Sequence, residues 1–187
     1  MDKDSYLIQK ATKQSGSVTL TCRFDKNLYH LLQKDAERNG GSLNFLINSI
    51  VKRYASWEKY AEEIGFIPLT KETVRLIFKN LDDQSVHMIA NQIGRTIPKK
   101  SILLMFNKID FDSIISFFVI TLSRYGMVQH EINGRTHDII LHHNVNSKFS
   151  DFLAQVARAM AKDLHLKLTV QEVDRNVLFI SIKEIPK

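Results

Sequence analysis

The sequence VTLTCRF, residues 18–24, decides how the first part of the chain folds. Apolar and polar residues alternate strictly in it, with Val18, Leu20, Cys22 and Phe24 at every second position. Successive side chains of a β-strand point to opposite faces, so this pattern is typical of a strand that buries one face. We therefore predict a half-buried strand over residues 18–24, with Cys22 facing inward.

Two helices are predicted directly after this strand. Asp25 stands where a helix N-cap belongs, and leucines follow it with helical spacing until Asn39-Gly40-Gly41 ends the run. Ser42 is the next N-cap, and apolar residues recur behind it at intervals of three and four up to Tyr54. One strand and two short helices leave strand edges unpaired and bury little apolar surface. We therefore expect a second copy of the chain to complete the unit.

The spacing from Val18 to Tyr54 resembles the ribbon-helix-helix DNA-binding domains of the Arc and methionine repressor type. In that family the strands of two chains pair antiparallel, and the resulting ribbon enters the major groove. The resemblance implies a dimer in which Thr19, Thr21 and Arg23 read base edges.

The same resemblance implies a phosphate site at the turn before the second helix. The family's Gly-x-Ser turn matches residues 40–42, so the backbone amides of Gly41, Ser42 and Leu43 are expected to hold a DNA phosphate. The sequence departs from the family at two positions. Asp25 replaces a frequent proline, and Phe45 replaces a polar residue, which suggests an additional element covering Phe45.

The chemistry of these residues agrees with that expectation independently of the family. Arginine can donate two hydrogen bonds to guanine, and threonine can offer a hydroxyl or pack its methyl group on thymine. The free amides of a helix N-terminus accept a phosphate oxygen. The alternative is that Thr19, Thr21 and Arg23 form only the solvated face of an ordinary hairpin strand.

The charge of the chain is compatible with a polyanionic partner. The 187 residues include 26 basic and 20 acidic side chains, a net charge of +6. Residues 1–56 hold nine basic and five acidic side chains, whereas residues 57–187 hold seventeen and fifteen. Most of the excess therefore lies in the smaller segment, as expected for a nucleic-acid-binding module. Residues 1–16 are polar and lack periodicity, so we predict a flexible arm there.

After residue 56 we predict a helical connector. An N-cap at Asp82 or Asp83 starts one helix, which Gly94 and Pro98 are expected to end. An N-cap at Asp110 or Asp112 starts another, whose run from Ile114 to Leu122 is apolar nearly all round and should be central.

The last third of the chain predicts two hairpins around one helix. Asn133-Gly134 provides the positive φ angles of a type I′ turn, Asn146 or Ser147 caps the helix, and the second hairpin turns at Asp174-Arg175. The order ββαββ predicts an antiparallel sheet. The fold class is therefore α+β: a dimeric ribbon-helix-helix at residues 17–56, followed by a connector and sheet domain at 57–187.

Histidines of the sheet domain are the candidate metal ligands. With an Asn133-Gly134 turn, His130 pairs with His137 on one face of the hairpin, and His143 lies further along that face. Metal ligation usually needs three or four convergent donors, and alternation places His142 on the other face. We therefore predict no metal and no cofactor.

An enzyme is not expected either. The sequence has no Gly-rich phosphate loop and no Gly-x-Ser-x-Gly motif, and an inward-facing Cys22 would be inert. Asp138, adjacent to His137 in a strand, should point away from it. The lone cysteine fits a reducing compartment, and the polar start carries no apolar signal region, so a cytoplasmic location is expected.

These observations predict a sequence-specific DNA-binding transcription regulator that acts as a homodimer or higher oligomer. Its partners would be double-stranded DNA, its own copy, and a ligand or protein at residues 57–187, with no membrane. One alternative is an antitoxin-like adaptor whose second domain masks a partner. The other is an enzyme in which the basic segment only dimerises.

Overall fold

The computed structural model describes residues 16–183, without the side chains of residues 171–174. Its contacts divide the chain into two compact units, Met1–Glu63 and Ile64–Lys187. The division predicted from the sequence lies earlier, after residue 56. The predicted flexible arm lies outside the described residues except for Gly16.

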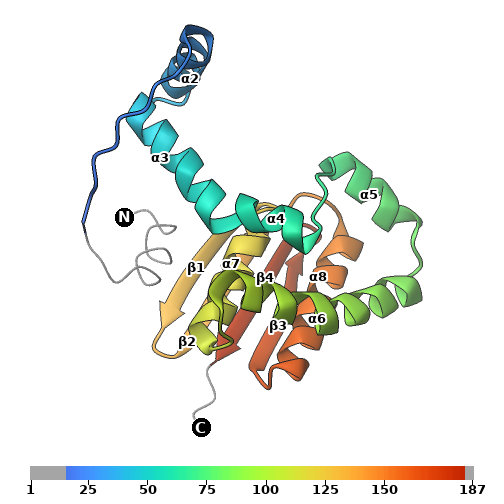
Figure 1. Ribbon diagram of the computed structural model, residues 1–187. Helices are drawn as coiled ribbons and strands as arrows, with labels where there is room; N and C mark the ends of the chain where they lie inside the picture. The colour runs from blue at the N-terminus through green and yellow to red at the C-terminus, as the bar shows by residue number, and fades with distance from the viewer. Residues whose placement is uncertain (1–15, 184–187) are drawn as a thin grey trace. The chain divides into compact units, whose positions relative to one another are not determined.

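The first unit is helical after an extended segment, residues 16–25 (Figure 1). Helix α2 (Lys26–Arg38) is followed by α3 (Leu43–Arg53), a π-helical turn η1 (Tyr54–Glu58) and α4 (Lys59–Ile64), which runs across the division. The predicted caps are confirmed, because Asp25 Oδ1 accepts the N–H of Leu28 at 2.8 Å and Ser42 Oγ accepts that of Phe45 at 3.2 Å. Local capping chemistry therefore sets where α2 and α3 begin.

The turn between α2 and α3 depends on its two glycines. Gly40 has φ +65°, a left-handed conformation that glycine adopts without strain. Its N–H donates to Glu37 O and that of Gly41 to Ala36 O, both at 3.0 Å. These two bonds form a Schellman motif, which satisfies the last carbonyls of α2 and reverses the chain into α3.

The segment at residues 18–24 differs from the sequence expectation in two respects. It is extended, but it is not a β-strand in the single chain, and its side chains are exposed, including Cys22. Val18 and Leu20 are 93% and 81% exposed. A strand exists only with a hydrogen-bonded neighbour, and the described part of one chain supplies none.

The second unit is an α+β fold with three layers (Figure 1). Its sheet has the order β1-β2-β4-β3, is antiparallel throughout, and consists of β1 (Met127–Asn133), β2 (Thr136–His142), β3 (Lys167–Asp174) and β4 (Val177–Lys183). Helix α7 (Phe111–Leu122) packs on β1 and β2, and α8 (Ser147–Asp163) packs on β3 and β4. Helix α6 (Asp83–Phe106) crosses over α8 as the third layer.

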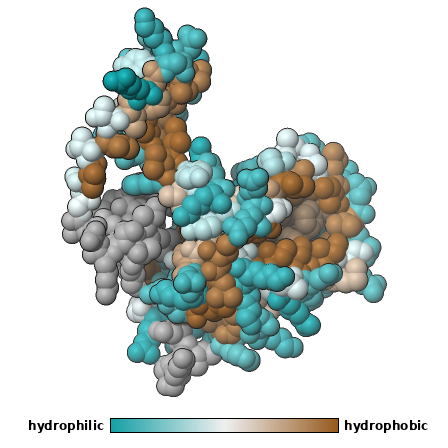
Figure 2. All heavy atoms as spheres, viewed as in Figure 1, coloured by the Kyte–Doolittle hydropathy of each residue, from teal (hydrophilic) through white to brown (hydrophobic). Residues whose placement is uncertain are grey.

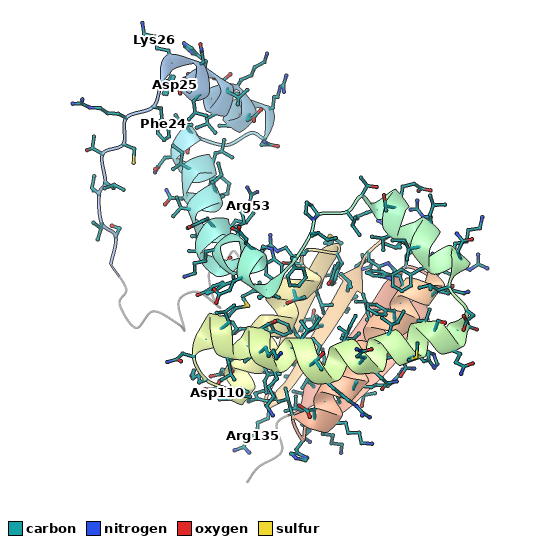
Figure 3. All side chains as sticks on the ribbon, turned by 45° about the vertical axis from the view of Figure 1, so that its right-hand side comes forward. Phe24, Asp25, Lys26, Arg53, Asp110 and Arg135 are labelled. Atoms are coloured by element: carbon teal, nitrogen blue, oxygen red, sulfur yellow. The ribbon has the colours of Figure 1, made fainter. Side chains whose placement is uncertain are left out.

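The core of this unit lies between the sheet and α7 and α8. Alternate residues of β2 and β4 are buried on one face of the sheet: Ile139, Leu141, Leu178, Ile180 and Ile182. Helix α7 is buried over most of its surface, as its apolar run predicts, and Asp110 caps it in a capping box with Ser113. Asp110 is labelled in Figure 3. The prediction of a central helix is therefore confirmed.

The outermost helix, α5 (Lys71–Asn80), is capped by Thr70, whose Oγ1 accepts the N–H of Thr73 at 3.1 Å. The Phe78 ring contacts those of Phe149 and Phe152 on α8, with centroids 5.2 and 5.0 Å apart. Arg75 Nε donates to Val145 O at 3.1 Å. An aromatic contact and a backbone contact together fix α5 to the start of α8.

The prediction that Gly94 and Pro98 end helix α6 is wrong. The helix continues to Phe106 with both residues buried. A Cβ on Gly94 would lie 2.6 Å from Val156 O and 2.7 Å from Ala159 Cβ. The glycine therefore marks close packing of α6 on α8 rather than a helix end, and tertiary packing overrides the low helix propensity of glycine and proline.

Both hairpin turns lie one residue later than predicted. The first loop is Gly134-Arg135, since Asn133 pairs with Thr136, and Gly134 has φ +63° at the first loop position, as a type II′ turn requires. The second loop is Arg175-Asn176, with a bulge between Glu172 and Asp174. None of the helices within residues 16–183 is both long and apolar enough to cross a membrane.

Candidate nucleic-acid interface

The predicted base-reading residues lie on the extended segment before α2. Thr19, Thr21 and Arg23 alternate with apolar residues along it and all three are exposed. Extended chain rises about 3.3 Å per residue, so Thr19 to Arg23 covers about 13 Å. The major groove of B-DNA is about 12 Å wide. The segment therefore has the length and exposure that a groove-reading strand needs.

Arg23 is available for bidentate hydrogen bonding. Within residues 16–183 its guanidinium forms no ion pair, whereas Arg38 lies 3.8 Å from Asp35 and Arg53 lies 2.6 Å from Glu58. A guanidinium without an internal acid keeps its donors for an external acceptor.

Several apolar side chains of the same unit are exposed, and most of the others are only partly buried. In the described part of the unit only Ala36 and Trp57 are buried. Phe45, which the sequence analysis expected to be covered, is 64% exposed, and Val51 and Tyr54 on the same helix region are exposed as well. Hydrophobic side chains of α2 and α3 are visible at the surface in Figure 2.

The predicted phosphate site at the start of α3 differs from the structure at Gly41. The amide of Gly41 donates to Ala36 O and so is engaged in capping α2. The amides of Ser42 and Leu43 precede the first hydrogen bonds of α3, in which Phe45 and Leu46 donate to Ser42. Asn44, the second residue of α3, adds an amide that the family motif did not include. The helix dipole favours an anion at these amides.

The histidines of the second unit do not form a three-ligand group. His130 and His137 share a face, as predicted, and His130 Nε2 lies 2.9 Å from His137 Nδ1. Their register differs from the prediction, because His130 pairs with Ile139 and His137 with Ile132. Within the described residues no three His, Cys, Asp or Glu side chains are grouped to hold a metal ion.

His143 has a structural environment of its own. It is fully buried, its Nδ1 accepts the N–H of Val145 at 3.1 Å, and its Nε2 lies 2.7 Å from Ser150 Oγ. Ser150 Oγ donates in turn to Arg175 O. Burial, with a smaller effect of the charge on Lys71, lowers the pKa of His143 to about 4. The imidazole is therefore neutral near pH 7 and joins the start of α8 to the second hairpin.

Asp138 lies on the opposite face of β2 from His137, as alternation predicts. Its Oδ1 accepts the hydroxyl of Ser181 at 2.6 Å and its Oδ2 accepts the amide of Asn133 at 3.2 Å. These bonds tie β2 to β4 and to the hairpin end, which is a structural arrangement.

Comparison with known proteins gives no family for this chain. Neither the models of protein families nor the curated proteins contain a match to its sequence. The site must therefore be interpreted from its residues.

Proposed function

We propose that this chain is a sequence-specific DNA-binding transcription regulator. Two copies would pair residues 18–24 antiparallel, and the resulting ribbon would place Thr19, Thr21 and Arg23 of each chain in the major groove. The amides of Ser42 and Leu43 would hold a flanking phosphate, and the second unit would carry a regulatory or interaction role.

One observation carries the proposal: an alternating segment stands extended and exposed before two capped helices. Val18 and Leu20 lose little of their contact with water within one chain, although each would be stabilised by about 1.5–3 kcal/mol if buried. Pairing of two such segments would bury these side chains and satisfy the strand's backbone groups at once. It would leave the threonines and the arginine on the outer face.

The test uses the full-length protein and its Arg23→Ala variant. Binding sites are selected from a pool of random duplexes, and the affinity of both proteins for the selected site and for unrelated DNA is measured by fluorescence anisotropy. We expect the variant to lose about 1–3 kcal/mol on the selected site and its preference at one base position. Its thermal stability should hardly change, because Arg23 is exposed.

The exposed Lys26, one position into α2, provides the matched control. Lys26→Ala removes the same charge without touching the segment that would read bases. Equal losses on specific and unrelated DNA for Arg23→Ala would make Arg23 a phosphate contact. No loss on either would reject the ribbon, and a stoichiometric protein partner in its place would favour the antitoxin-like adaptor.

A further inference from the structure

Helix α6 exposes a long face that carries only positive charge. Between residues 90 and 108 the sequence has four basic residues and no acidic residue. All four are exposed: Arg95, Lys99, Lys100 and Lys108. The opposite side of the helix is buried at Gly94, Pro98 and Ile102, and Gly94 packs directly on α8. The close packing on α8 therefore fixes the direction of the charged face.

Internal acids neutralise only part of this charge. Lys99 Nζ lies 3.9 Å from Asp163, and Lys108 Nζ lies 2.5 Å from Asp110, which raises the pKa of Lys108. Within residues 16–183 neither Arg95 nor Lys100 forms an ion pair. Arg95 and Lys99 also stand four residues apart, where like charges repel each other on a helix. The face therefore favours an external anion.

The spacing of the charges suits an extended polyanion better than a single anionic group. Arg95 lies eleven positions before the end of α6 at Phe106 (106 − 95), about 16 Å at 1.5 Å per helical residue, and Lys108 follows two residues after that end. DNA carries regularly spaced phosphates, with one base pair per 3.4 Å, so the helical part alone corresponds to about five base pairs. The exposed side chains between the charges, including Thr96 and Asn107, are neutral and would not repel phosphates.

We propose that this basic face of α6, defined by Arg95, Lys99 and Lys100 on the helix and Lys108 just after its end, contacts the phosphate backbone of DNA. The inference rests on the proposed function, and it adds a second contact region on the unit that does not read bases. Such contacts carry no sequence information and strengthen binding in a salt-dependent manner. The second unit would then contribute directly to affinity.

The test compares two double variants of the full-length protein. Arg95→Gln/Lys100→Gln removes the two unpaired charges of α6. Lys167→Gln/Lys183→Gln removes two exposed charges that face each other across β3 and β4, and serves as the matched control. Affinity is measured by fluorescence anisotropy between 50 and 300 mM salt, on the selected site alone and on the same site with about ten flanking base pairs on each side.

We expect the α6 variant to bind the longer duplex several-fold more weakly than the wild type. The slope of log K against log salt should fall in magnitude by about 1.8 per chain, at about 0.9 per lost phosphate contact. The wild type should gain affinity from the flanking DNA and the α6 variant should not. The control variant should behave as the wild type does.

Each other result identifies what failed. An unchanged salt slope in the α6 variant, with Arg23→Ala still losing specificity, overturns the α6 contact and leaves the proposed function standing. Equal losses in both double variants overturn it too, because net charge alone would explain them. A third result would also overturn the α6 contact with DNA: the wild type binds vesicles that contain an anionic lipid, the α6 variant does not, and both bind DNA equally. Wild-type protein that binds no duplex overturns both proposals.

Discussion

The two units of the chain use the same apolar patterns and reach opposite results. In the second unit the alternating residues of β2 and β4 are fully buried, because α7 and α8 cover that face of the sheet. In the first unit the alternating residues 18–24 are exposed and the helical stripe of α3 is only partly buried. The pattern specifies which face is to be buried, and burial requires that the covering element be present. The second unit contains its own covering elements, and the first unit has too few.

The largest loss of stability is expected from a substitution at Leu20, which a second copy of the chain is proposed to cover. Leu20→Asp would place two carboxylates in the core that two chains are proposed to share, and no folded first unit should remain. Circular dichroism should report loss of helix, and light scattering should report a monomer.

Thr21→Asp is the matched control for that change, because it adds the same charge on the alternate face. It should leave the dimer folded. A wild-type protein that is stable and monomeric at low micromolar concentration would contradict the comparison itself.

The second largest effect is expected in the self-contained unit, at Gly126. A Cβ there would lie 1.9 Å from His142 O, a backbone atom that cannot move without disturbing β2. Gly126→Ala should therefore lower the free energy of unfolding by more than about 3 kcal/mol, at or above the upper end of overpacking costs. Urea denaturation measures it. Gly16→Ala, which meets no atom within 4 Å, should be neutral, and two equally stable variants would contradict the packing at Gly126.

Acid should distinguish the units as well, through His143. Its pKa is about 4 when folded and 6.5 when unfolded, so between these values the unfolded chain binds more protons. The stability that depends on the neutral imidazole is complete above pH 6.5 and is lost as the pH falls toward 4. The difference of 2.5 pH units (6.5 − 4) corresponds to up to about 3 kcal/mol.

Urea denaturation at pH 7 and pH 5 measures this loss in the second unit. A His143→Gln variant has no imidazole to protonate, so its unfolding free energy should change less between the two pH values. An equal change in wild type and variant would assign the acid sensitivity to other groups.

The smallest effects are expected at two equivalent helix caps. Ser42→Ala and Thr70→Ala each remove a side-chain acceptor at a helix start, and each should cost about 1 kcal/mol. Only Ser42→Ala should also weaken DNA binding, because its helix N-terminus is the proposed phosphate site. Thermal melts and anisotropy on the same proteins separate the two consequences, and a similar loss of DNA affinity in Thr70→Ala would count against that site.

Features fixed by neighbouring residues could be predicted from the sequence. The caps at Asp25, Ser42 and Asp110 depend on a side chain three residues from the amide it accepts, and all three are present. Gly94 and Pro98 were misread as a helix end, because their place in α6 depends on α8, some sixty residues away. The hairpin turn was misplaced because only Gly134 takes a positive φ, which selects a different turn type.

The candidate site divides in the same way. Alternation, which is local, predicts the exposure of Thr19, Thr21 and Arg23, but the apolar residues between them are exposed as well because no described element covers them. The engagement of the Gly41 amide could have been inferred from the paired glycines, since a Schellman motif needs the second amide as well as the first. The basic face of α6 could not be predicted, because a helix that ends at Gly94 does not include the basic residues that follow.

The strand order of the sheet has a consequence for how quickly the second unit folds. Each hairpin pairs residues close in sequence, and isolated hairpins form in about 1–10 μs. The two hairpins join only through the pairing of β2 with β4, in which His142 lies opposite Val177. Before this pairing can form, residues 143–176 must close into a loop that contains α8. Loop closure of this length lowers the folding rate, because its entropy is lost before the new contacts form. Substitutions in the paired strands β2 and β4 should therefore slow folding, whereas substitutions in β1 or β3 at the sheet edges should mainly speed unfolding.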